Sequence, residues 1–166
     1  WELNTCGSSL TGSDALSHPL GLGTNYGSHT GTSPLSQVTQ NYGGFFGIAT
    51  VIAAGNETGL AHHYAGRFSA DTSFEDVELR VGEEEGKRGF ILELWSSAAD
   101  LYTVGLISGG ERISRIPILS NNETRIPFLL ESTVITVSYQ LIEAGSGSQL
   151  VSMRFERPSP GIWTIR

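Results

Sequence analysis

The most constraining feature of this 166-residue sequence is the run GIATVIAAGNE, which spans Gly47 to Glu57 and ends its apolar stretch in Gly55-Asn56. An apolar run of this length, bounded by glycine, is typical of a strand covered on both faces. A polar side chain at the end of such a strand is held by a rigid scaffold, where site residues tend to lie. The amide of Asn56 can therefore donate a hydrogen bond to a developing oxyanion. The alternative is that Gly55-Asn56 only turns the chain, and the run taken alone favours that simpler interpretation.

Composition excludes several classes of protein. The sequence is 39% hydrophobic and 16% charged, which is typical of a globular protein, and its net charge of −7 argues against a nucleic-acid-binding surface. No apolar stretch reaches the roughly 20 residues that a membrane-spanning helix needs. No signal peptide is recognised at residue 1, and because that residue is Trp1 we expect the chain to be a piece of something longer. Cys6 is the only cysteine, so we expect no internal disulfide, and its Gly/Ser/Thr-rich surroundings favour an inert thiol over a nucleophile.

The chain changes character near residue 66, and the part before it predicts a strand–helix–strand unit. Residues 20–24 end a first strand and residues 47–54 form the second, which makes this an α/β unit with parallel strands. Between them Ser33-Pro34 predicts a helix start, because Ser accepts a hydrogen bond from a free N–H group and Pro suits the first helical position. Gly43-Gly44 predicts the end of that helix. The apolar residues in between recur on one helical face: Leu35, Val38 and Tyr42.

The part after residue 66 is β-like throughout, because apolar and polar residues alternate in short segments separated by turn residues. The segments lie around 77–81, 90–94, 102–106, 111–119, 125–130, 133–141, 151–155 and 162–165. Pro117 and Pro127 favour edge or irregular strands, and Glu83-Glu84-Glu85 beside Gly86 is expected to be a solvated hairpin tip. Some eight strands at this spacing predict a sandwich or a jelly roll. Alternation leaves one face of each sheet wet, so this part can stand as a module.

The predicted fold class is therefore an α+β mixture with two parts. Residues 1–66 would form a partial α/β unit, and residues 67–166 would form an all-β domain.

Several motifs resemble a known family of enzymes. GTNYGSH at 23–29, VIAAGNE at 51–57 and HHY at 62–64 look like the middle of a subtilisin-like serine protease, closest to the clostridial germination-protease branch. Members of that branch carry a jelly-roll domain between the catalytic His and Ser, and the tail MRFERPSPGIWTIR at 153–166 resembles its end. The resemblance covers about residues 20–166. It implies a fragment of a bacterial endopeptidase, secreted or spore-associated, that uses no cofactor and whose partners are a peptide or protein substrate and the rest of the subtilase domain.

The resemblance also assigns roles to particular residues. In subtilases, of which subtilisin is the standard example, the Asn that ends this strand donates a hydrogen bond from its side-chain amide to the oxyanion of the tetrahedral intermediate. The resemblance therefore implies the same role for Asn56. The residues that would line the primary specificity pocket are Ala53, Ala54 and Gly55. The residues that would form the strand edge pairing with an extended substrate are Gly21, Leu22 and Gly23. Subtilases place several more apolar residues before that edge, whereas here only Leu20 separates it from Pro19.

The catalytic triad is expected outside this chain. In the subtilase order Asp and His precede the region and Ser follows it, so the chain alone should not cleave peptides. Gly31-Thr32-Ser33 matches the family's nucleophile motif in letters, but it precedes the Asn56 strand and runs into Pro34. We therefore interpret Ser33 as a helix cap.

The histidines do not predict a metal site. Adjacent side chains on a strand point to opposite faces, and no cysteine or second His pair completes a site with His62 and His63 at a recognisable spacing. We favour a structural role for these two. His29 lies in a Gly-rich loop with no obvious acid or base partner in the sequence.

A second interpretation comes from another functional class. The β-rich part could be a binding or interaction module, lectin-like and without catalysis, in which Trp95, Tyr102 or Trp163 stacks on a sugar or a partner. The alternation of apolar residues favours core positions for most of these rings.

Overall fold

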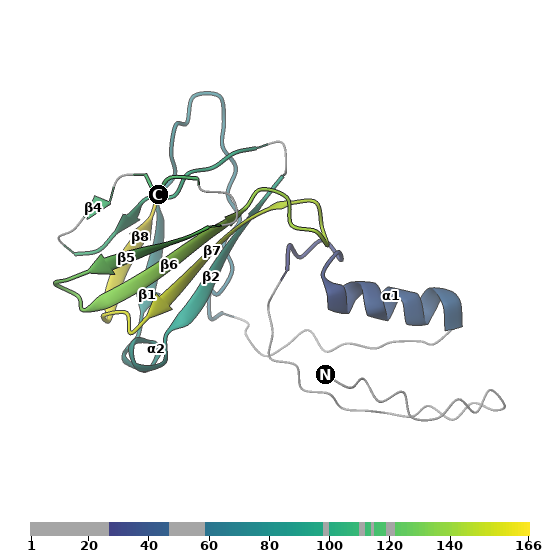
Figure 1. Ribbon diagram of the computed structural model, residues 1–166, viewed down its shortest axis with the longest axis horizontal. Helices are drawn as coiled ribbons and strands as arrows, with labels where there is room; N and C mark the ends of the chain where they lie inside the picture. The colour runs from purple at the N-terminus through teal and green to yellow at the C-terminus, as the bar shows by residue number, and fades with distance from the viewer. Residues whose placement is uncertain (1–26, 47–58, 98–99, 110–111, 114, 119–121) are drawn as a thin grey trace.

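The computed structural model describes residues 27–46, 59–97, 100–109, 112–113, 115–118 and 122–166, and the bounds of every element below refer to these residues. Two antiparallel β-sheets pack face to face, and helix α1 (Pro34–Phe46) stands to one side of them (Figure 1). The protein is therefore mixed but strand-rich, as predicted, and its strands form a β-sandwich. None of the helices in these residues is long and apolar enough to cross a membrane.

The described strands form two sheets of four. The first has the order β1 (Val77–Val81), β8 (Gly161–Ile165), β3 (Leu106–Ile107), β4 (Arg112–Ile113). The second has the order β2 (Phe90–Ser96), β7 (Gln149–Glu156), β6 (Thr133–Gln140), β5 (Glu123–Phe128). The first described strand thus pairs with the last and the second with the next to last. The chain changes sheet after β1, after β2, after β4 and after β7.

The core lies between the sheets and follows the predicted alternation. On β6 and β7 every second side chain points inward and is buried: Thr133, Ile135, Val137, Tyr139, Gln149, Val151, Met153 and Phe155. Trp163 of β8 is 1% exposed, and its ring meets Phe128 and Phe155 edge-on at centroid distances of 5.0 and 5.7 Å. Its indole N–H donates to the carbonyl of Ser159 at 3.0 Å, so the polar end of this buried side chain is satisfied.

Two buried backbone groups in this core depend on one side chain. The hydroxyl of Tyr139 accepts a hydrogen bond from the Val104 N–H at 3.2 Å and donates one to the Ile116 carbonyl at 3.3 Å. Burial raises the pKa of Tyr139, although the Val104 N–H opposes that shift by stabilising the phenolate. Tyr139 therefore fastens the connections around β3 and β4 to the opposite sheet.

Several expected boundaries were wrong. Helix α1 does not stop at Gly43-Gly44 but continues to Phe46, because neither glycine takes the positive φ that a glycine stop uses. The acidic run is not a hairpin tip but the first turn of helix α2 (Glu83–Arg88). Acidic residues there and Lys87 and Arg88 in the last turn both suit the helix dipole. Gly86 allows α2 to lie against the β7–β8 connection, since a Cβ there would be 2.8 Å from the Pro158 carbonyl oxygen.

Strand lengths around the prolines also differ from the prediction. Of residues 102–106 only Leu106 lies in a strand, and within 111–119 the described strand is limited to Arg112–Ile113. Pro127 does lie in an edge strand, because β5 is the last strand of its sheet. Gly105 exchanges two backbone hydrogen bonds with Arg166, at 2.6 and 2.8 Å, so the chain end continues the pairing of β3 with β8.

Candidate functional site

The residues that the sequence singled out as a site lie outside the described residues. They are Gly21, Leu22, Gly23, Ala53, Ala54, Gly55 and Asn56. The strands predicted at 20–24 and 47–54 lie outside them as well, so these predictions stay predictions. Their flanking segments are described: loop 27–33 and α1 before residues 47–58, and residues 59–76 after them.

Ser33 occupies the position that a helix cap requires. Its Oγ accepts a hydrogen bond from the Ser36 N–H at 3.2 Å and shares another with the Ser36 hydroxyl at 2.8 Å, while its carbonyl accepts the Gln37 N–H at 2.9 Å. The cap at the start of α1 is thus confirmed. Within the described residues, the Ser33 hydroxyl is engaged by its own helix, not by a histidine, so it lacks the base that activates a serine nucleophile.

The loop before α1 docks on the sandwich at a place that we call the junction, formed by Gly27, Gln37, Glu93, Trp95 and Gly145. The Glu93 carboxylate accepts the indole N–H of Trp95 at 2.9 Å and the backbone N–H of Gly27 at 3.4 Å. The Gln37 amide donates to the Gly145 carbonyl at 3.2 Å (Figure 1 shows the β6–β7 connection reaching the start of α1). These contacts join segments 66 and 108 residues apart in sequence, so they define how α1 is held.

The geometry of the junction restricts which residues fit there. Gly27 is buried with φ +122°, and a Cβ at this position would lie 2.9 Å from the Cβ of Ser33. Both facts favour glycine. On the sandwich side, hydrogen bonds from the Gly145 N–H, the Ser146 hydroxyl and the Ser146 N–H, in that order, lower the pKa of Glu143. Its ionised carboxylate therefore shapes the turn that meets Gln37.

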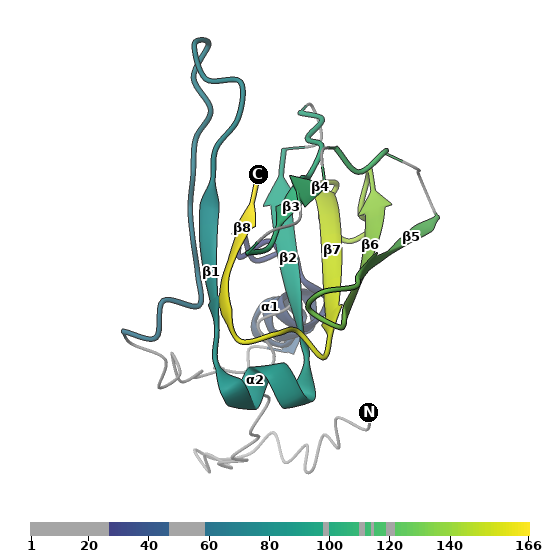
Figure 2. The same ribbon diagram turned by 90° about the vertical axis from the view of Figure 1, so that its left-hand side faces the viewer.

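Residues 59–76, which we call the arm, form the second segment attached to the sandwich. Figure 2 shows them running beside β1 and beyond its start before they turn back into it. The Arg166 guanidinium holds the base of the arm: its Nε donates to Asp76 at 2.6 Å, and its Cζ lies 4.3 Å from the Phe74 ring centre. The Tyr64 hydroxyl donates to Glu75, and this hydrogen bond raises the pKa of Tyr64. The arm carries exposed large apolar side chains: Leu60, Tyr64, Phe68 and Phe74.

The rings proposed for the binding-module interpretation are only partly available. Trp163 is buried in the core, so that candidate was wrong. Tyr102 is half-buried and stacks on Phe68 of the arm at 5.1 Å, and Trp95 is half-buried with its N–H engaged by Glu93. Exposed aromatic rings lie instead on the arm and at Phe45 of α1, where the alternation argument for strands does not apply.

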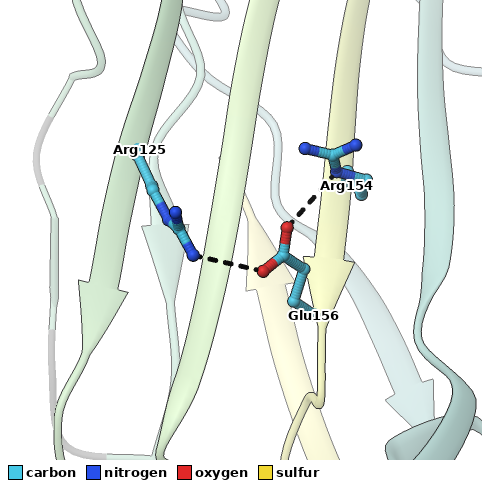
Figure 3. A network of polar contacts seen from close by, with 3 residues as sticks. All are labelled: Arg125, Arg154 and Glu156. Atoms are coloured by element: carbon cyan, nitrogen blue, oxygen red, sulfur yellow. Dashed lines mark hydrogen bonds and ion pairs between the residues drawn. The ribbon is translucent and has the colours of Figure 1, made fainter.

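The outer face of the sheet β2–β7–β6–β5 carries a charged network (Figure 3). Glu156 meets Arg125 at 3.3 Å and Arg154 at 3.5 Å, and the two arginines flank Thr136 in one cross-strand row. All three side chains are solvent-exposed by a third or more, so the pairs contribute at most about 1 kcal/mol each. We interpret this network as a solvated surface.

One pairing of chemistry-bearing side chains was not anticipated. The His29 ring, in loop 27–33, lies against the His63 ring, in the arm, with ring centres 5.5 Å apart. The two residues are 34 positions apart in the sequence, and no local pattern relates them.

In comparisons with known proteins, no family model matches this chain, and no curated protein sequence matches it.

Proposed function

We propose that this chain is part of a subtilisin-like serine endopeptidase and supplies the oxyanion donor Asn56 and an inserted jelly-roll domain. The observation that carries the proposal is the apolar run that ends in Asn56, placed directly after a Ser-capped helix. The motifs at 23–29, 62–64 and 153–166 add to it. The proposed division is residues 1–66 for the protease part and residues 67–166 for the insert.

The fold of the second part supports this assignment. A jelly roll is a double-sheet antiparallel fold of eight strands. The described residues contain eight strands in two sheets, and β1 beside β8 and β2 beside β7 are the outer pairs expected when a long hairpin is rolled up. The inner strands differ from that order, because β3 pairs with β4 instead of β6, so the strand order supports a β-sandwich. The attachments support it further, because α1 and the arm are both fastened to the sandwich and flank residues 47–58 in the sequence.

In the proposed mechanism the chain contributes one electrostatic element. The Asn56 amide would donate to the oxyanion that forms when the nucleophile, supplied from outside this chain, attacks the scissile carbonyl. Residues 53–55 would line the pocket, and residues 21–23 would hold the substrate as an added strand. The chain alone is expected to be inactive.

The test uses the full-length parent protein. Asn56→Ala should lower kcat by about 10²–10³ and leave KM nearly unchanged, because the donor acts on the transition state more than on the bound substrate. Asn122→Ala, an exposed asparagine on the sandwich, is the matched control and should leave kcat unchanged. An unaltered kcat in Asn56→Ala would remove the oxyanion role. For the isolated chain, specific labelling of Ser33 by a fluorophosphonate probe would contradict the proposed inactivity.

The exposed apolar side chains of the arm favour one alternative, a β-sandwich binding module without catalysis. A glycan array and a pull-down with the whole chain distinguish the two. Binding that is lost in Phe68→Ser and kept in Ile91→Ser, an exposed apolar control on β2, would support the module. An inactive parent that still binds through the arm would replace the protease proposal with this one.

A further inference from the structure

We infer that His29 and His63 form a site for a divalent transition-metal ion of the kind that imidazole binds, such as Zn²⁺, Ni²⁺ or Cu²⁺. The inference rests on residues outside the proposed catalytic machinery and is independent of it. Both side chains are exposed, so an ion can reach them from solvent. Imidazole is a common ligand for these metals.

The separation of the two rings suits one shared ion. With Zn–N bonds of about 2.0–2.1 Å and a tetrahedral angle, the centres of two coordinated imidazoles lie roughly 5 Å apart. The observed distance is 5.5 Å, and the ring planes are tilted by 50°. Two rings stacked face to face would direct their nitrogens away from a common point, whereas tilted rings can direct one nitrogen each toward it.

The backbone that carries His29 is well supported. His29 has φ +57°, a left-handed conformation in which histidine is enriched relative to most residues. Its neighbours Ser28, Thr30 and Thr32 join their hydroxyls in a triangle with distances of 2.6, 2.9 and 3.1 Å. The Gln40 amide donates to the Gly31 carbonyl at 3.0 Å and so ties the loop to α1. A ligand on such a loop loses little conformational freedom when it binds a metal.

His63 is supported from the other side. The next residue, Tyr64, donates its hydroxyl to Glu75, and the adjacent Asp76 is paired with Arg166 of the sandwich. Both imidazoles therefore project from segments that are fastened independently. An ion between them would cross-link loop 27–33 to the arm, the two segments that flank residues 34–58 in sequence.

The number of ligands indicates what kind of site this is. Among the described residues, no group of three or more His, Cys, Asp or Glu side chains gathers closely enough to hold a metal. The two imidazoles would fill two coordination positions and water would fill the others. We therefore expect an open, exchangeable site, because structural zinc sites in proteins use four protein ligands.

The experiment is isothermal titration of the untagged, chelator-treated chain with ZnCl₂ and with NiCl₂ at pH 7.5. Wild type should bind one ion, and His29→Ala and His63→Ala should each weaken binding by about tenfold or more, since each removes one of two ligands. His62→Ala is the matched control, because His62 is the sequence neighbour of His63 and makes an interaction of its own. It should change the affinity less than about twofold. Circular dichroism and urea midpoints without metal check that each variant folds.

Two results would overturn the inference. One is binding by His29→Ala/His63→Ala equal to that of wild type, which would mean that the ring contact is only packing. The other is a loss in His62→Ala as large as in His63→Ala, which would place the ligands elsewhere. An inactive parent protease would bear on the proposed function and would leave this assignment as it stands.

Discussion

Tyr139→Phe tests whether the two sheets depend on one hydroxyl. The substitution keeps the ring that fills the core and removes the oxygen that bonds the Val104 N–H and the Ile116 carbonyl. Tyr139, Val104 and Ile116 are at most 2% exposed, so water cannot replace the lost partner without a structural change. Leaving a buried polar group unpaired costs about 1–3 kcal/mol. Two such groups, with partial relaxation, give an expected loss of about 2–4 kcal/mol in the free energy of unfolding.

Equilibrium unfolding in urea measures this loss directly. For a chain of this size we expect the midpoint to fall by about 1–2 M, with little change in the slope m. Tyr64→Phe is the matched control, because it removes the same atom from an exposed Tyr–Glu hydrogen bond, and it should shift the midpoint much less.

A midpoint unchanged by Tyr139→Phe would refute the reasoning, because it would show that Val104 and Ile116 find other partners. The pKa of Tyr139 gives a second check. It is raised in the folded state, so the folded protein binds this proton more tightly than the unfolded chain, and that contribution is fully present below about pH 10 and lost as pH rises further. Tyr139→Phe should therefore flatten the alkaline part of the stability profile.

Two further predictions concern the junction. Gly27→Ala should cost about 1–3 kcal/mol locally and speed amide exchange in loop 27–33, because it adds a steric clash with Ser33 to a strained φ of +122°; Gly147→Ala, at φ +70° with open space around it, should show strain alone, and equal exchange in the two variants would contradict the clash. The pKa of Glu143 is lowered in the folded state, so its contribution is present above about pH 4.3 and lost as pH falls through the lower folded value. The protection factor of the Ser146 amide, which is its exchange rate relative to that of an unstructured peptide at the same pH, should therefore fall in acid, and Glu143→Gln should abolish that pH dependence.

Alternation of apolar residues was sufficient to predict the sandwich core. In residues 133–139 and 151–155 the apolar residues recur at every second position. Successive side chains of a strand point to opposite faces of the sheet, so all the apolar ones lie on one face, which packs between the sheets. The start of α1 was predictable for a similar reason, since Ser33-Pro34 satisfies the first N–H groups locally. Both predictions rest on patterns formed by residues that are close together in the sequence.

The features that the sequence did not predict depend on distant partners. Helix α2 lies against Pro158 in the β7–β8 connection. Gly105 exchanges backbone hydrogen bonds with Arg166, which is distant from it in the sequence. The arm is fixed by Arg166, and His29 meets His63 across 34 positions. No periodic pattern encodes such contacts. The role of Asn56 is likewise a prediction from sequence alone, because it lies outside the described residues.

The attachments give the sandwich a specific part in the proposed enzyme. Helix α1 is held by Gln37 on Gly145 and by Gly27 on Glu93, and the arm is held by Arg166 on Asp76. The segment that carries Asn56 thus enters from one anchored element and leaves into another. Fixing both ends of a segment reduces the conformations open to it, at an entropic cost that grows only slowly with its length. A donor that must meet an oxyanion within a few tenths of an ångström gains from such restriction. If the proposed role of Asn56 is right, the sandwich would restrict this segment through its two anchored neighbours, and loosening the junction by Gly27→Ala should lower kcat of the parent more than it raises KM.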